Sequence, residues 1–197
     1  TIIDYVEDAV NNGEISESRL DDGCRRILTV KENRGILDWK ESNFSLNKAL
    51  STVGSATNRA TEREIAAAAV TVVKNENNTL PLVVKEKQKI LMLCPYDNER
   101  AQMIMGYNRA KEAGLIPDSA EVKVVRYNGS NMDAVKENID WADTVFVNSE
   151  ISTASRFSSN HWLYSNVEDI VDYTHEKGKK SIVMSVDKPY DVQMYAN

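Results

Sequence analysis

The chain has 197 residues, of which 42% are hydrophobic and 27% charged, so it is long enough for one globular domain and part of another. Its net charge of -6 and isoelectric point near 5.1 make nucleic acids and anionic membranes poor partners, because both are polyanions. No apolar run reaches the roughly 20 residues that a membrane-spanning helix needs. The two cysteines and two histidines show no metal-ligand spacing, and we expect Cys24 and Cys94 to be buried free thiols.

The first 37 residues predict two helices. Apolar residues recur at helical spacing over residues 2–10, and Asn11-Asn12-Gly13 ends that pattern. Ser16 is expected to cap the second helix, which Gly35 ends. The apolar stripe of the second helix consists of Leu20, Cys24, Ile27 and Val30. Because the chain begins inside the first helical pattern, we expect an upstream part of the protein to be missing, and the sequence indicates no cellular compartment.

The next stretch predicts a linker and then a third helix. Residues 38–58 are polar and have no sustained period, which is typical of a linker, with a short helix expected around residues 46–50. Thr61 and Glu64 form a capping-box pattern, in which each side chain satisfies a free backbone N–H of the first turn. Lys74 is expected in the last turn, where a cation meets the negative end of the helix dipole.

The remainder of the chain alternates between strand and helix patterns. Short apolar runs predict strands at residues 90–94, 122–127, 144–147 and 181–186, with helices between them. This alternation predicts an α/β domain with a mainly parallel sheet and helices on both faces. The turn after the first strand, Pro95-Tyr96-Asp97-Asn98, contains no glycine, so it does not predict a phosphate-binding loop.

Three stretches resemble family 3 glycoside hydrolases. Residues 9–37 resemble the end of the catalytic barrel of that family, with Ile36 in place of the usual leucine. Residues 69–82, which contain Lys74-Asn75 and Leu80-Pro81-Leu82, resemble the opening of its C-terminal domain. Residues 142–147 and 179–191 resemble later strands of that domain. The resemblance implies barrel helices at 1–37, a linker at 38–58 and a flavodoxin-like α/β sandwich at 59–197.

The resemblance also implies a chemistry. Enzymes of this family are retaining β-glycosidases that use a carboxylate nucleophile and no cofactor or metal. The nucleophile lies upstream of the region present here, so no catalytic residue is expected in this chain. In the β-glucosidase branch, a Gly-Glu-Gly-x-Asp-Arg-like loop of the C-terminal domain supplies the acid. Here Thr153-Ala154-Ser155 stands in place of Gly-Glu-Gly, and Glu150 is only a weak candidate. This departure favours the β-N-acetylglucosaminidase branch, in which a barrel histidine transfers the proton.

Other residues are candidates for lesser roles. Arg156, His161 and Trp162 are candidates for a loop that faces the substrate, although a cap on the edge of the sheet is the favoured role of Trp162. Six residues match family motifs and are expected to have structural roles, with Asp191 capping a helix: Lys74, Asn75, Pro81, Pro189, Tyr190 and Asp191.

The sequence therefore favours the non-catalytic C-terminal portion of an exo-β-N-acetylhexosaminidase. The intact enzyme would act on terminal β-linked N-acetylglucosamine of cell-wall or chitin-like glycans, and the partners of this region would be its own barrel domain and the carbohydrate. One alternative is the same region of a family 3 β-glucosidase. Another is a stand-alone flavodoxin-like module that binds a small ligand or partner. Helices from a barrel should leave the stripe of Leu20, Cys24 and Ile27 exposed.

Overall fold

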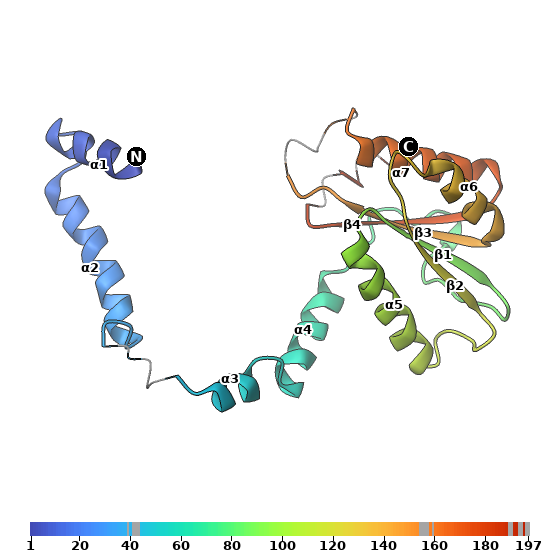
Figure 1. Ribbon diagram of the computed structural model, residues 1–197, viewed down its shortest axis with the longest axis horizontal. Coiled ribbons are helices and arrows are strands. Elements are labelled where there is room, and N and C mark those ends of the chain that lie inside the picture. The colour runs from blue at the N-terminus through green and yellow to red at the C-terminus, as the bar shows by residue number, and fades with distance from the viewer. Residues whose placement is uncertain are drawn as a thin grey trace. The chain divides into compact units, whose positions relative to one another are not determined.

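The computed structural model describes residues 1–38, 40, 44–153, 158, 160–188, 191–192 and 195. The chain divides into two compact units, Thr1–Val70 and Thr71–Asn197 (Figure 1). The regular elements described in the first unit are helices, and the second unit contains the sheet. Among the described residues, no helix is both long enough and apolar enough to cross a bilayer.

The first unit consists of the helices α1 (Ile2–Asn11), α2 (Glu17–Asn33), α3 (Leu46–Thr52) and α4 (Ala56–Ala69). Both α1 and α2 lie where the sequence predicted helices. The Ser16 hydroxyl caps α2 as expected, accepting a hydrogen bond from the Arg19 backbone N–H at 3.2 Å. The short helix predicted within the linker is present as α3.

Helix α4 begins and ends earlier than the sequence indicated. Its cap is Ser55, whose hydroxyl accepts from the Asn58 backbone N–H at 3.3 Å. The capping box predicted at Thr61 and Glu64 is wrong, because Thr61 lies inside the helix and its hydroxyl donates to the Thr57 carbonyl at 3.2 Å. The helix ends at Ala69, before a run of β-branched residues that favours extended backbone. Lys74 is therefore not in the last helical turn.

The first unit has no buried core within its helices. None of the residues of α1, α2, α3 or α4 is buried. Leu20 and Ile27 are exposed on α2. Cys24 is also exposed, so the expectation of a buried thiol is wrong there, whereas Cys94 is buried; both cysteines are free thiols.

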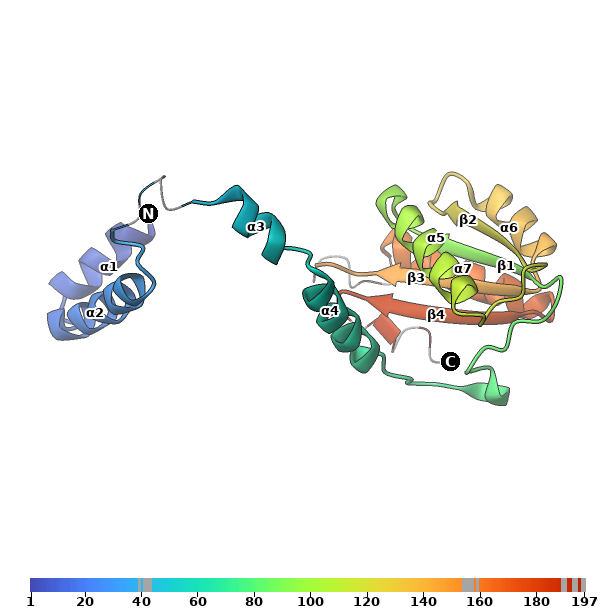
Figure 2. The ribbon, with the colours of Figure 1, turned by 90° about the horizontal axis from the view of Figure 1, so that it is seen from below.

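The second unit contains a four-stranded, all-parallel sheet. Its strands are β1 (Lys89–Cys94), β2 (Glu121–Arg126), β3 (Thr144–Glu150) and β4 (Lys180–Val186), in the order β2-β1-β3-β4 (Figure 2). In the register of the sheet, Ile90 pairs with both Val122 and Thr144, and Thr144 pairs with Lys180. All four strands were predicted, and β3 extends three residues beyond its apolar run.

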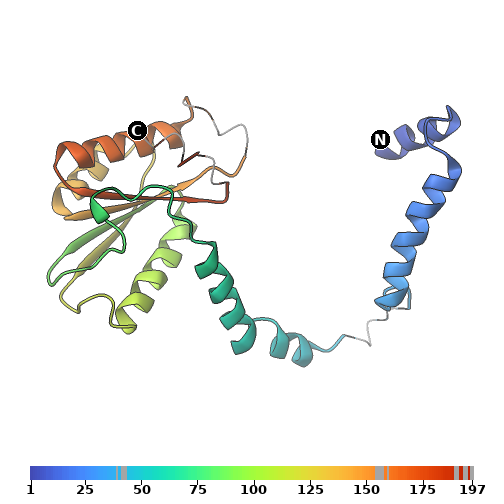
Figure 3. The same cartoon turned by 180° about the vertical axis from the view of Figure 1, so that it is seen from behind.

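Three helices cover the sheet: α5 (Asp97–Glu112), α6 (Met132–Trp141) and α7 (Trp162–Glu176). Helix α5 lies on one face, and α6 and α7 lie on the other (Figure 3). The chain moves outward from β1 to β2 and then returns past β1 to β3. Because such crossovers are right-handed, this reversal places α5 and α6 on opposite faces. The predicted α/β fold with helices on both faces is confirmed.

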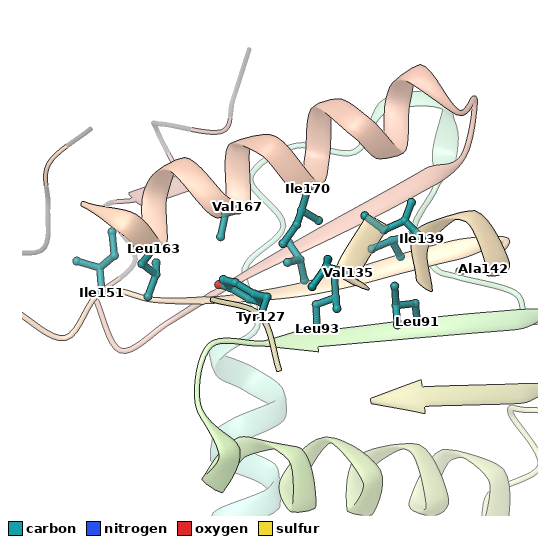
Figure 4. Close-up of a cluster of buried hydrophobic side chains, with 12 residues drawn as sticks. Leu91, Leu93, Tyr127, Val135, Ile139, Ala142, Ile151, Leu163, Val167 and Ile170 are labelled. Atoms are coloured by element: carbon teal, nitrogen blue, oxygen red, sulfur yellow. The ribbon is translucent and has the colours of Figure 1, made fainter. Parts of the chain in front are cut away.

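The main core lies between the sheet and the helices α6 and α7 (Figure 4). Successive strand residues point to opposite faces, so Leu91 and Leu93 enter this core, whereas Met92 points to the α5 side. The core is a cluster of twelve buried side chains: Leu91, Leu93, Tyr127, Val135, Ile139, Ala142, Val145, Val147, Ile151, Leu163, Val167 and Ile170. On the α5 side, Met92 and Phe146 are only half-buried and Met184 is exposed. That face is therefore incompletely covered.

Candidate functional site

The carboxyl ends of the four parallel strands meet at one edge of the sheet. Strand β1 lies next to β3 in the sheet, although the chain leaves β1 towards β2 on the other side. Such a reversal of strand order opens a crevice, where open α/β sheets commonly bind their ligands. The end of β3 at this edge carries Asn148, Ser149 and Glu150, and α5 begins just after β1.

A hollow of about 440 Å³ lies on the α5 side of this edge. Polar side chains from α5 and β3 form one part of its lining, and apolar side chains from three strands and α5 form the rest. We call it the acceptor hollow, and its polar members are chiefly Glu99, Asn148 and Glu150, with Asn98 and Gln102. Its apolar wall includes Met92, Met103, Tyr107, Phe146, Met184 and Val186.

Glu99 and Asn148 are the buried polar residues of the acceptor hollow. Their side chains retain only 6% and 4% of their full exposure. The Asn148 side-chain N–H donates to Oε2 of Glu99 at 2.8 Å, which joins β3 to the first turn of α5. The second carboxylate oxygen of Glu99, Oε1, and the amide oxygen of Asn148, Oδ1, find no hydrogen-bond donor among the described residues. Two buried acceptors thus face the hollow without a donor.

The two carboxyl groups of the hollow interact. Burial and the neighbouring Glu150 carboxyl together raise the pKa of Glu99 to about 7, while the amide of Asn148 opposes both effects. Near pH 7 Glu99 is therefore partly protonated, because a buried carboxyl group beside a second carboxyl group is costly to ionise.

Aromatic side chains gather at the same edge on the other face. The Trp162 ring meets the rings of Tyr96 and Tyr127 edge to face, with centroids 6.3 Å and 6.4 Å apart. His161 lies 5.7 Å from Trp162, centroid to centroid, and its Nδ1 caps α7 by accepting from the Leu163 backbone N–H at 3.3 Å. Trp162 also packs against the main core. These contacts fix both candidate residues at the start of α7, and their role towards a substrate stays a prediction.

Asp191 joins the ends of β3 and β4. Its buried carboxylate accepts hydrogen bonds from the hydroxyls of Ser149, at 2.5 Å, and Ser185. Tyr195 approaches the same Ser149 hydroxyl at 3.1 Å. The carboxylate thus cross-links two strands, and the helix cap that the sequence indicated at Asp191 stays a prediction.

The opening motif of the second unit forms a local turn. The Asn75 side chain donates to the Leu80 carbonyl at 2.8 Å and accepts from the Leu80 backbone N–H at 2.9 Å, which closes the turn before the cis peptide bond of Pro81. Lys74 pairs with Glu76 at 3.3 Å. Three predicted candidates lie outside the described residues: Arg156, Pro189 and Tyr190.

Sequence reasoning selected Glu150 but missed Glu99 and Asn148. Glu150 was considered because it precedes a loop with a family resemblance. A different signal was present, since Glu99 lies in the first turn after one apolar strand and Asn148 lies near the end of the neighbouring strand. The rule that the carboxyl ends of parallel strands share one edge would have brought them together. Among the described residues, no group of three or more histidine, cysteine, aspartate or glutamate side chains could hold a metal ion.

Known proteins similar to this chain are glycosidases. Over 88 residues the chain is 30% identical to a protein from Cellulomonas fimi named β-N-acetylglucosaminidase/β-glucosidase. Over 207 residues it is 22% identical to a protein from Pseudoalteromonas piscicida named β-hexosaminidase A. No profile of a known protein family matches the chain. The chain is thus distantly related to glycoside hydrolases.

The two matches cover different shares of this chain and of the two related proteins. The match to the Cellulomonas protein takes in 45% of this chain and 15% of that protein. The match to the Pseudoalteromonas protein takes in 95% of this chain and 32% of that protein. The chain therefore spans a third or less of the length of these curated relatives, and the longer match extends over both structural units.

Proposed function

We propose that this chain is the non-catalytic C-terminal region of a retaining exo-β-N-acetylhexosaminidase. The observation that carries the proposal is the similarity to a protein named β-hexosaminidase A over 95% of the chain. In this proposal, α1 and α2 are the last helices of the catalytic barrel and the second unit is the family's C-terminal α/β domain. The intact enzyme releases terminal β-linked N-acetylglucosamine from cell-wall or chitin-like glycans.

The first unit supports a role in packing against a barrel. Helices α1 and α2 are amphipathic, yet they contain no buried residue. Ile3 is 76% exposed and Ile27 58% exposed. Exposed apolar stripes of this kind are typical of surfaces that another part of a protein covers. The rest of the barrel is the covering partner in this proposal.

The second unit supports a role without catalysis. Glu150, the weak candidate for a proton donor, lines the acceptor hollow with Glu99, and the two carboxyl groups interact. Proton transfer by a barrel histidine, as in the N-acetylglucosaminidase branch, needs no carboxyl group from this region. His161 and Trp162, fixed at the start of α7, are the side chains that we propose to face the carbohydrate, together with Arg156.

One observation favours a second candidate, the same region of a family 3 β-glucosidase. The name of the Cellulomonas relative joins β-N-acetylglucosaminidase and β-glucosidase.

A stand-alone nucleotide-binding module is disfavoured by the first turn of α5, which carries Asp97 and Glu99. These carboxylates repel a phosphate group at the helix N-terminus, where such folds usually bind it.

The test is an assay with chromogenic β-N-acetylglucosaminide and β-glucoside substrates. We expect the 197-residue chain alone to be inactive. Its addition to a separately produced barrel domain should raise turnover of the N-acetylglucosaminide above that of the barrel alone. Turnover by the chain alone would overturn the non-catalytic assignment, and a preference for the glucoside would favour the second candidate.

A further inference from the structure

We propose that the acceptor hollow binds a primary ammonium group carried on a short apolar stem. The inference stands apart from the glycosidase proposal, because it depends only on the second unit. It rests on three features: two buried acceptors without a donor, a second carboxyl group beside them, and an apolar wall that is partly open to solvent.

The first feature is the match between acceptors and donors. An ammonium group has three N–H donors and no acceptor. The hollow offers the Glu99 carboxylate, the Asn148 amide oxygen and the Glu150 carboxylate. Two of these acceptors, Oε1 of Glu99 and Oδ1 of Asn148, belong to side chains that are more than nine-tenths buried and find no donor among the described residues. A bound ammonium group would satisfy both, and buried acceptors left without a donor are costly.

The second feature is the sign of the charge. The lining of the hollow includes Glu99 and Glu150 and, in the part of the chain that the structure describes, no lysine, arginine or histidine. The site therefore favours a cation over an anion or a neutral molecule of the same shape. A calcium ion suits it less well, since calcium takes six to eight oxygen ligands and these three residues supply fewer well-placed ones.

The third feature is the apolar wall. Met92, Phe146 and Met184 lie on the face of the sheet that α5 covers incompletely, and Met184 retains 40% of its full exposure. An alkyl stem attached to the ammonium group would bury methylene groups against these side chains. Lysine side chains lie on apolar surfaces in the same way, with the stem packed and the charged end held by polar groups.

Binding exchanges the ammonium group for the Glu99 proton. Below about pH 7 Glu99 retains a proton, which must pass to the buffer before its carboxylate can face a cation. The other titratable groups described near Glu99 are Tyr107 on α5, Cys94 on β1 and Tyr127 after β2, with Asp97, Arg100 and Arg126 near Cys94. Burial raises the pKa of Cys94 to about 11 and that of Tyr127 well above its usual value, so both stay neutral in this range.

The experiment uses the 197-residue chain labelled with ¹³C at its methionine methyl groups. Three of the six methionines line the hollow, namely Met92, Met103 and Met184, while Met105 and Met132 serve as internal controls elsewhere. We expect n-butylammonium to shift the three hollow signals selectively. Its affinity should rise between about pH 6 and about pH 8, as Glu99 loses its proton. n-Butanol, which has the same stem without the charge, should not shift these signals at the same concentrations.

Variants keep the test specific. Glu99→Gln and Glu150→Gln should each weaken n-butylammonium binding by about tenfold or more, because a charge-assisted hydrogen bond is lost. Glu112→Gln, at the far end of α5, should bind like the unmodified chain. The methyl spectrum of Glu99→Gln also reports whether its sheet is folded. Weaker binding by this variant can therefore be distinguished from unfolding.

Several outcomes would overturn the proposal. Equal shifts with n-butanol would show that the hollow takes only an apolar stem. Displacement of n-butylammonium by calcium at lower concentration would identify a metal site instead. Absence of any shift with n-butylammonium would also overturn it. Tighter binding of Nα-acetyl-lysine methylamide than of n-butylammonium would support the same chemistry and identify a protein lysine as its source.

Discussion

The hydroxyl of Tyr127 donates a hydrogen bond of 2.8 Å to the main-chain carbonyl of Asn148. Tyr127 follows β2 and Asn148 lies on β3, so this bond passes the carboxyl end of β1, which lies between those strands. Tyr127 is fully buried, and burial raises its pKa well above the usual value, which keeps the hydroxyl protonated as a donor. The bond therefore holds the strand end that presents Asn148 to the acceptor hollow.

Replacement of Tyr127 by phenylalanine tests this relationship. The variant keeps the ring that packs against Trp162 but removes the donor, leaving the Asn148 carbonyl without this partner. We expect the free energy of unfolding to fall by about 1–2 kcal/mol in urea titrations. Tyr164→Phe is the matched control, because the Tyr164 hydroxyl only meets Glu168 near the surface. An equal loss in both variants would contradict a special role for the buried bond.

The pH dependence of stability provides a second prediction. Glu99 has a pKa of about 7 in the folded chain against 4.5 as its ordinary value, so the folded state binds more protons between these two values. Stability should then fall as the pH rises through this window, because ionisation of a buried carboxyl is costly. Glu99→Gln removes this group, so its stability should exceed that of the unmodified chain by on the order of 1–3 kcal/mol above pH 7.

The measurement is chemical unfolding of both proteins at several values of pH. At low pH, where Glu99 is protonated in both states, the two stabilities should converge. Glu112→Gln serves as a control on the same helix and should follow the unmodified chain throughout. Parallel curves for the unmodified chain and Glu99→Gln would show that Glu99 does not titrate with a raised pKa.

The fold could be predicted because its signals are local. Each strand is a short apolar run bounded by polar turns, and alternation of strand and helix leaves few arrangements other than a parallel sheet. The errors arose where two local signals competed. Ser55 and Thr61 are both good helix caps, and only the helix begun at Ser55 contains the five residues between them. Cys24 lies on an apolar stripe, but the described part of the chain does not cover that stripe.

The site was harder to predict because its contacts join distant parts of the chain. Glu99 and Asn148 are 49 residues apart, and Ser149 and Asp191 are 42 residues apart. No local pattern shows that the first turn of α5 lies beside the end of β3. The topology of the sheet supplies that information, since β1 and β3 become neighbours only when the chain returns past β1. Glu150 was selected from a resemblance, without knowledge of its partner.

A third prediction concerns Asp191, which joins the ends of β3 and β4. Asp191→Ala removes the acceptor of the Ser149 and Ser185 hydroxyls and leaves the buried Ser149 without its charged partner. We expect a loss of about 2–3 kcal/mol in the free energy of unfolding. Asp172→Ala, at an exposed position on α7, should change stability by less than about 0.5 kcal/mol. Similar small effects of both substitutions would contradict the cross-linking role.

The last prediction separates the stability of this chain from its role towards a barrel. Ile27 is 58% exposed on α2, so Ile27→Asp should change the stability of the isolated chain by less than about 0.5 kcal/mol. If the α2 stripe packs against a barrel, the same substitution should abolish the increase in N-acetylglucosaminide turnover when the chain and barrel domain are mixed. A buried, unpaired carboxylate at such an interface costs several kcal/mol, in contrast to its small effect in water.

Thr29→Asp is the matched control, because it places the same charge on the same helix about 200° around the axis from Ile27. It should leave the increase in turnover intact, and circular dichroism should show equal helix content in both variants. Equal loss of the increase in the two variants would mean that added negative charge, rather than the apolar stripe, governs the association. Retention of the increase by Ile27→Asp would exclude this stripe as the surface that contacts the barrel. The similarity of the first unit to the related hexosaminidase would then not be explained by packing of this stripe.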